Sequence, residues 1–261
     1  MRLDAYLFSA KKFPSRTKSA EAIEKGLVSV NGKTVLKPSL NVNDNDVVTV
    51  SENDEFVSNG GYKLEKALSE FGIDVNGLVF ADVGASTGGF TDCLLRRGAK
   101  KVFAIDVGES QLSEKLKSDD RVVVVDNFNA RNLTAEVTGE VVDGVTCDVS
   151  FISLTYVLKP ICDVLKDDGF AVVLLKPQFE CGKKELNKNG IVTSLKARLE
   201  CALKIKTFAL SVGLTPVRFT FAPIKQGKNV EYLFLLTKKK AETITDEEIS
   251  DVINESVKTQ S

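Results

Sequence analysis

Short apolar segments alternate with helix-like segments over most of the chain after residue 77. The apolar segments include LVFADVG, KVFAIDVG, RVVVVD and FAVVLLKP. Strands that are apolar at nearly every position must be buried on both faces, so this pattern predicts a mostly parallel, doubly wound sheet with helices on each side. The last two segments, TPVRFTFA and EYLFLLT, are joined by a glycine-containing loop, which predicts an antiparallel hairpin at the sheet edge. The expected fold class is therefore α/β.

The residues before this pattern predict a separate small α+β module. Two helical patterns near residues 2–10 and 15–26 precede an Asn31-Gly32 pair between apolar residues, which is a strong hairpin signal. Another strand is expected over residues 46–50, and an acidic, polar stretch follows it. We therefore expect a first domain over residues 1–50, a linker over 51–60, a second domain over 61–240, and a charged tail over 241–261 that ends in a short helix or in disorder.

Local charge is more informative than the net charge of −1. Residues 1–37 contain eight lysines and arginines against three acidic residues, and residues 183–206 contain seven against two. A solvated helix face is the simplest explanation of either cluster. On a compact module, however, the basic excess also suits phosphate contacts. The candidate RNA-binding residues there are Arg2, Arg16, Lys18 and Lys33.

The chain contains no histidine, which excludes Ser-His-Asp triads and histidine-ligated zinc. Its five cysteines are widely spaced and include no C-x-x-C pair, so free thiols in a reducing compartment are expected. We find neither a signal peptide nor an apolar run of membrane-spanning length. These features predict a soluble, cytoplasmic protein without a bound metal, and we expect a monomer.

The stretch ADVGASTGGFTD, residues 81–92, predicts a glycine-rich turn between a strand and a helix. Gly84 and Gly89 fit the dinucleotide pattern G-x-G-x-x-G, but Ser86 occupies the middle position, where glycine lets the backbone approach a pyrophosphate. A Walker phosphate-binding sequence is absent as well. The next strand ends at Asp106, whose carboxylate can bind ribose hydroxyls. A nucleoside without a pyrophosphate, such as S-adenosylmethionine, fits this pattern, although such turns also serve packing alone.

Four motifs give the chain a more specific resemblance. DVGASTGGFTDCLLRRGAKKVFAIDVG, CDVSFISL, LLKPQFECGK and GKNVEYLFLL resemble the TlyA (haemolysin A) family of ribosomal RNA 2′-O-methyltransferases. Residues 1–56 resemble an S4 RNA-binding domain, and residues 57–240 resemble a Rossmann-like, FtsJ-like methyltransferase. The resemblance implies S-adenosylmethionine-dependent methylation of a cytidine ribose in ribosomal RNA, naked or in a subunit. The short N-terminus resembles the family members that modify large-subunit rRNA.

The resemblance also carries a Lys-Asp-Lys-Glu tetrad onto Lys63, Asp148, Lys176 and Glu231. Without histidine, the base that activates a ribose hydroxyl must be a lysine or a carboxylate. We assign Lys176 as the general base, because a charge at the end of an apolar strand needs a partner or ligand. Asp148 and Lys63 would tune and position it, and a neighbouring cation together with burial would lower a lysine pKa. Glu231 would orient the ribose or the ammonium groups. Taken singly, Lys63 and Glu231 could be surface residues and Asp148 a helix cap.

The expected cofactor site centres on the glycine turn. Asp106 would hold the ribose, and the residues after the strand RVVVV would meet the adenine. The full expected set is Gly84, Ala85, Ser86, Gly88, Phe90, Asp106, Asp126, Asn127 and Asn129. Two positions depart from the family pattern: Asn59 stands where arginine is usual and Tyr62 where histidine is common, which puts RNA contacts there in doubt.

Three other functions compete with rRNA methylation. A membrane-active haemolysin would need a spanning or strongly amphipathic segment, which the sequence lacks. A non-catalytic RNA-binding protein would be expected to have lost the tetrad or the glycine turn. A small-molecule methyltransferase would not explain the basic N-terminal module.

Overall fold

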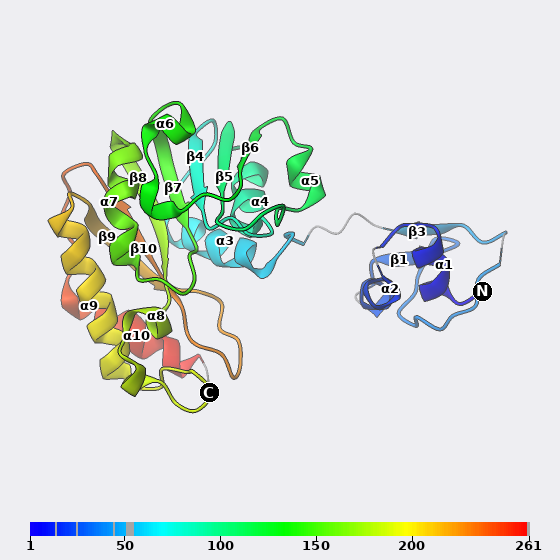
Figure 1. The fold of residues 1–261 in the computed structure, drawn as a ribbon. Helices are drawn as coiled ribbons and strands as arrows, with labels where there is room; N and C mark the ends of the chain where they lie inside the picture. The colour runs from blue at the N-terminus through cyan, green and yellow to red at the C-terminus, as the bar shows by residue number, and fades with distance from the viewer. Residues whose placement is uncertain (14, 25, 44, 51–54, 260–261) are drawn as a thin grey trace. The chain divides into compact units, whose positions relative to one another are not determined.

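The structure is a computed structural model that describes residues 1–13, 15–24, 26–43, 45–50 and 55–259. The chain divides into two compact units, Met1–Glu55 and Phe56–Ser261 (Figure 1). Their boundary falls inside the stretch expected to be a linker, of which residues 51–54 lie outside the described residues. Each unit has its own hydrophobic core, so each is described separately.

The first unit contains helices α1 (Leu3–Ser9) and α2 (Arg16–Glu24) and a sheet in the order β2-β1-β3. Strands β1 (Val28–Val30), β2 (Lys33–Thr34) and β3 (Val48–Val50) pair antiparallel. Asn31 and Gly32 have φ angles of 52° and 77°, as a two-residue hairpin turn requires. The core is small and apolar: Leu3, Leu7, Ala22, Ile23, Val28 and Val42. The expected α+β module is therefore present.

The second unit is built on a seven-stranded sheet in the order β6-β5-β4-β7-β8-β10-β9. Strands β4 (Val79–Val83), β5 (Lys101–Ile105), β6 (Val122–Val125), β7 (Val142–Cys147) and β8 (Leu165–Leu175) are parallel. Strand β10 (Tyr232–Thr237) lies antiparallel between β8 and β9 (Thr215–Phe221). This confirms the mostly parallel sheet with an antiparallel hairpin at one edge.

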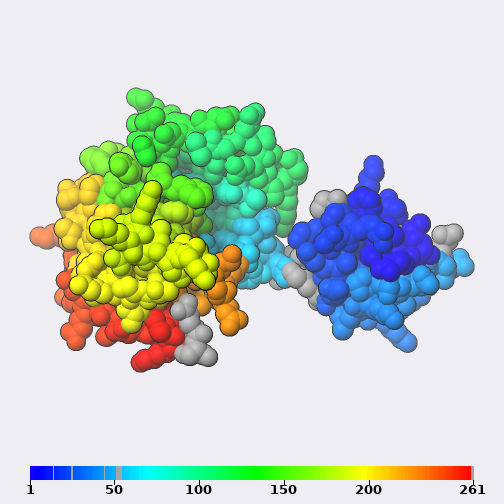
Figure 2. Space-filling view, turned by 60° about the horizontal axis from the view of Figure 1, so that its bottom comes forward, coloured from blue at the N-terminus to red at the C-terminus, as the bar shows by residue number. Residues whose placement is uncertain are grey.

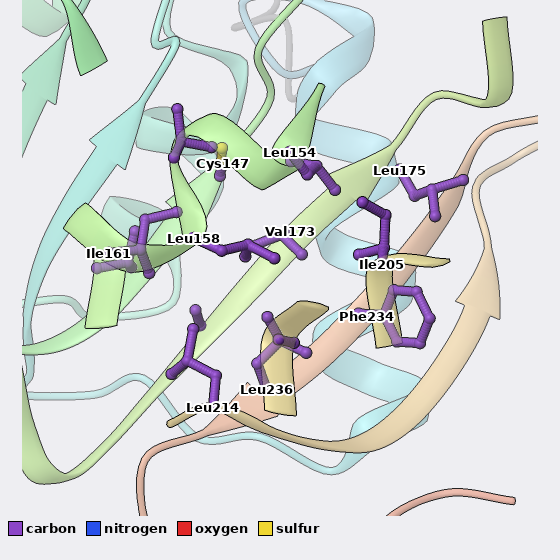
Figure 3. Close-up of a cluster of buried hydrophobic side chains, with 14 of the residues drawn as sticks. Cys147, Leu154, Leu158, Ile161, Val173, Leu175, Ile205, Leu214, Phe234 and Leu236 are labelled. Carbon is purple, nitrogen blue, oxygen red and sulfur yellow. The ribbon is translucent and has the colours of Figure 1, made fainter. Parts of the chain in front are cut away.

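Helices cover both faces of this sheet (Figure 1). Val172 and Leu174 of β8 pack in the cluster that contains α3 (Asn59–Phe71), α4 (Gly89–Arg96) and α5 (Glu114–Lys117). Val173 and Leu175, which alternate with them, pack in the opposite cluster with α7 (Leu158–Val164) and α9 (Leu195–Ser211), as Figure 3 shows. Successive strand residues thus fill two cores, which explains why β8 is apolar at nearly every position. The short helices α6 (Ala135–Thr138) and α8 (Pro177–Glu180) lie in the connections.

Two segments differ from the sequence expectation. The VVVV segment forms β6 at the edge of the sheet, where Val123 and Val124 are each 37% exposed, so it is not buried on both faces. Residues 241–261, expected to be a charged tail, include the long helix α10 (Asp246–Lys258), which packs on α9 and β9. Ile249 and Ile253 of α10 are buried because apolar residues four positions apart share one helix face.

Candidate active site

Four charged side chains meet where the parallel strands of the second unit end. Asp148 follows β7 directly, and Lys176 follows β8 directly, so both lie at the carboxyl edge of the sheet. Strand β10 runs antiparallel to β8, with Tyr232 opposite Leu175, so Glu231 before β10 reaches the same edge as Lys176 after β8. Lys63 comes from the first turns of α3. The topology therefore brings together the four residues of the expected tetrad.

The tetrad forms a continuous chain of ion pairs. Lys176 Nζ lies 2.5 Å from Asp148 Oδ1, and Lys63 Nζ lies 3.6 Å from Asp148 Oδ2. Lys63 Nζ is also 2.6 Å from Glu231 Oε2. The side chains are only 9–20% exposed, so water screens these pairs less than it screens surface pairs. Asp148 is the central carboxylate because it contacts both lysines.

Two carboxylates dominate the surroundings of Lys63 in this chain of ion pairs. Burial lowers the pKa of Lys63, but the Asp148 and Glu231 carboxylates outweigh it and raise that pKa above the usual lysine value. Lys63 is therefore a fixed ammonium at neutral pH and does not serve as a base. Lys176 makes an additional contact, since its Nζ donates to Ser150 Oγ at 2.6 Å.

The glycine turn of residues 84–88 lies against this cluster. Gly84 has φ +82°, and a Cβ there would lie 2.7 Å from the carbonyl oxygen of Asp148. Only glycine therefore lets the turn after β4 approach the end of β7 so closely. Gly88 has φ +94°, and a Cβ there would overlap Leu116, so this glycine serves packing against α5.

Asp82, just before the turn, is completely buried inside the sheet. Its carboxylate accepts hydrogen bonds from Thr91 Oγ1 at 2.6 Å and from Thr146 Oγ1 at 2.9 Å. These bonds tie β4 to α4 and β7. Burial nevertheless dominates and raises the pKa of Asp82 to about 6.

A cavity of about 290 Å³ opens beside the turn, near the lower end of the usual size range of small-molecule sites. Asp106 is at its mouth, where its two oxygens accept backbone hydrogen bonds from Ser86 N at 2.8 Å and Gly108 N at 2.7 Å. Each carboxylate oxygen has a second lone pair, so Asp106 can still accept from a ligand hydroxyl. The walls are mostly apolar: Ile105, Val107, Phe128, Ala130, Val149 and Ile152, with Gly84, Asn129, Arg131 and Ser150.

Three of the nine expected cofactor residues line this cavity: Gly84, Asp106 and Asn129. Phe90 is 3% exposed and packs in the α3–α4 core instead. Asp126 accepts from Ser110 N at 3.0 Å and so fixes the neighbouring loop. Lining positions that the sequence analysis did not identify include Phe128, Ser150 and Ile152. Their positions just after strands β6 and β7 could have identified them, because ligands bind at the carboxyl ends of parallel strands. The remaining expected residues, Ala85, Ser86, Gly88 and Asn127, do not line this cavity.

A second cavity, of about 570 Å³, adjoins the tetrad. Lys63 and Glu231 form part of its wall, together with Asn59, Tyr62 and Gln178. Among the described residues, the buried Oε1 of Gln178 has no hydrogen-bond partner, so it is available to a bound group. The loop 222–230, between β9 and β10, forms the remaining wall. The tetrad therefore adjoins both cavities: Lys63 and Glu231 line the larger one, and Ser150, which binds Lys176, lines the smaller one.

Comparison with known proteins assigns both units. The model of the FtsJ-like methyltransferase family matches residues 56–239, and that of the S4 domain matches residues 1–48. The chain belongs to the FtsJ-like methyltransferase family. The chain is thus a methyltransferase with an N-terminal S4 domain.

Similar proteins span nearly the whole chain. Hemolysin A of Brachyspira hyodysenteriae is 43% identical over 89% of this chain and 98% of its own length. The 16S/23S rRNA (cytidine-2′-O)-methyltransferase TlyA of Mycobacterium tuberculosis is 38% identical over 98% of this chain and 97% of its own. A solved structure from Streptococcus thermophilus, described as a hemolysin, is 35% identical and has a TM-score of 0.75, covering 99% of this chain and 96% of its own. Within the described part of this methyltransferase, every helix is too short or too polar to span a membrane.

The S4 domain positions the four expected RNA-binding residues on its surface, but three of them have acidic partners. Arg2 and Arg16 both contact Asp4, at 2.8 and 3.3 Å, and hydrogen bonds from Arg2 hold the pKa of Asp4 down at about 2. Lys18 pairs with Glu21 at 2.6 Å. Lys33 is exposed on β2. The basic excess of this domain is therefore partly neutralised where the candidate residues lie.

Proposed function

We propose that this methyltransferase transfers a methyl group from S-adenosylmethionine to the 2′-hydroxyl of a cytidine in ribosomal RNA, with large-subunit rRNA as the expected target. The observation that carries the proposal is the tetrad's contact with two cavities, through Lys63 and Glu231 in the larger one and through Ser150 in the smaller one. One cavity adjoins the glycine turn and suits a nucleoside cofactor, and the other, of about 570 Å³ and lined in part by charged side chains, is large enough to admit a ribose. The protein acts on rRNA or a ribosomal subunit, and therefore in the cytoplasm.

The residues of the smaller cavity fit S-adenosylmethionine. Asp106 has free lone pairs for the ribose hydroxyls, and Phe128 and Ile152 offer apolar walls to a purine ring. Ser86 at the middle of the turn has φ +49° and does not leave the bare backbone that a pyrophosphate needs. When bound, the cofactor supplies an electrophilic methyl group.

The tetrad supplies the acid–base and positioning chemistry. Lys176 takes the proton of the ribose hydroxyl, and Ser150 fixes the direction of its Nζ. Asp148 holds Lys176 at 2.5 Å and stabilises the ammonium that Lys176 becomes once it has taken the proton. Lys63 remains an ammonium that stabilises the developing negative charge, and Glu231 holds Lys63 in place.

The test uses rRNA from a strain that lacks the corresponding gene. The purified protein and S-adenosylmethionine should convert one cytidine to 2′-O-methylcytidine, detected by mass spectrometry of nuclease fragments from each subunit. A protein that binds the RNA and yields no methylated ribose in either subunit would refute the proposal and favour a non-catalytic role. Methylation of a small-molecule acceptor alone would favour a different substrate class.

A further inference from the structure

Two loops of the methyltransferase domain carry exposed lysines without acidic partners. The first loop, residues 181–194, follows α8, and the second, residues 222–231, joins β9 to β10. Glu185 is the exposed acidic residue of the first loop, and Glu231 at the end of the second belongs to the tetrad. Among the described residues, these lysines form no ion pair: Lys183, Lys184, Lys188, Lys225 and Lys228.

Side-chain hydrogen bonds join the two loops into one surface. Asn229 of the second loop accepts from Val192 N at 2.8 Å and donates to Gly190 O at 2.9 Å. On the other side, Arg198 of α9 donates to Val192 O at 3.0 Å. Both backbone groups of the buried Val192 are thus held by side chains from different elements. The first loop is fixed in place, so its lysines are presented at defined positions.

The joined loops adjoin the larger cavity of the active site. Lys225, Lys228 and Asn229 line that cavity together with Lys63 and Glu231 of the tetrad. In Figure 2 the first loop (yellow-green to yellow) and the second loop (orange) lie next to each other on the face turned toward the viewer. A chain of phosphates lying over these loops would therefore pass the opening that leads to the tetrad.

We propose that the two loops form a second RNA-binding surface, which holds the phosphates flanking the target nucleotide. This inference rests on the proposed function and adds the site that places the substrate. A solvated lysine surface is the simpler alternative, but it would not need the loops to be joined by Asn229 and Arg198. Arg2, Arg16 and Lys18 of the S4 domain are already paired with carboxylates, whereas these lysines are free to meet phosphate.

The test measures RNA affinity against salt concentration for the full-length protein, without methyl donor. One double variant is Lys225→Gln/Lys228→Gln, and another is Lys184→Gln/Lys188→Gln. The matched control is Lys239→Gln/Lys240→Gln, which removes the same charge from two exposed lysines. The control pair follows the far end of β10, away from the tetrad edge, because β10 runs antiparallel to β8.

Each phosphate contact contributes roughly 0.7 to 0.9 to the slope of log affinity against log salt. Each loop variant should therefore flatten the slope by about 1.5 and weaken binding about 30-fold at 0.1 M salt. The control should keep the wild-type slope, and all variants should keep wild-type S-adenosylmethionine affinity.

Wild-type slopes in both loop variants would overturn the inference, as would weaker binding with an unchanged slope. The two proposals fail separately. If the loop variants flatten the slope but the wild-type protein methylates no RNA, the proposed function is refuted and the RNA-binding surface is supported. If the protein methylates RNA normally and the loop variants keep the wild-type slope, the proposed function is supported and the RNA-binding surface is refuted.

Discussion

Replacing the buried Asp82 with asparagine should stabilise the methyltransferase domain at neutral pH. The pKa of Asp82 rises from 3.8 to about 6 on folding, because burial disfavours the carboxylate more than its two threonine hydrogen bonds favour it. Ionisation therefore opposes folding wherever the pH exceeds the unfolded pKa. At about 1.4 kcal/mol per pKa unit, the cost at pH 7 is about 3 kcal/mol.

The sign of the pH dependence follows from the same shift. Between pH 4 and 6 the folded protein holds a proton that the unfolded chain has released, so rising pH removes stability until about pH 6, and the loss then levels off. The asparagine side chain of the variant does not titrate in this range. Its amide accepts from one threonine and donates to the other hydroxyl, which can rotate to receive the bond. The stability difference between the Asp82→Asn variant and wild type should therefore grow from pH 4 to pH 7.

The assay is urea denaturation followed by circular dichroism at several pH values from 4 to 8. Asp143→Asn is a control of opposite sign. Burial raises the pKa of Asp143, but the hydrogen bonds from Lys166 and from Val79 N lower it by a larger amount, so the folded-state pKa is below the unfolded one. The Asp143 carboxylate therefore stabilises the fold at any pH above its unfolded pKa. That variant should lose stability at neutral pH and approach wild type in acid. A difference for Asp82→Asn that does not change with pH would refute the reasoning.

Three other changes test the site. Lys176→Ala should lower methyl transfer by about 10² to 10⁴ while calorimetry shows normal cofactor affinity, and Lys176→Arg should fail as well because a guanidinium does not release its proton. Gly84→Ala should weaken both cofactor binding and thermal stability, because its Cβ would lie 2.7 Å from the Asp148 carbonyl at φ +82°; unchanged melting and calorimetry would contradict this. Removing residues 1–55 should leave cofactor affinity intact in calorimetry and sharply reduce rRNA methylation, whereas full methylation would show that the S4 domain is dispensable.

The sheet and two members of the tetrad were predictable from the positions of strand ends, whereas Lys63, on helix α3, was expected from the family resemblance. Asp148 and Lys176 directly follow apolar segments, and a parallel sheet gathers such residues at one edge whatever the details of packing. The position of β6 at the edge of the sheet was not predictable. Its VVVV sequence is typical of a buried strand, but at the edge two of its valines remain 37% exposed. The strand order depends on contacts far apart in sequence, which local patterns do not encode.

The residues that line the smaller cavity were only partly predictable, because the sequence shows neighbours along the chain and not neighbours in space. Sequence proximity to the glycine turn suggested Phe90, but the first turn of α4 directs this side chain into the core. Ser150 and Phe128 come from other strand ends and reach the cavity through the fold. The pKa of Lys63 also depended on geometry, because two carboxylates rather than the other lysine dominate its surroundings.

Because β10 runs antiparallel to β8, the strand pairing that positions Glu231 is separate from the loop that precedes it. Glu231 is positioned by the pairing of Tyr232 with Leu175, and that register does not depend on the length of the segment before it. The exposed tip of this loop, residues 225–228, can therefore change in length or charge while the tetrad keeps its geometry. Under the proposed function, a protein built in this way can change which RNA surface it accepts without moving the four charged side chains, so substrate choice and catalysis can evolve independently along one chain.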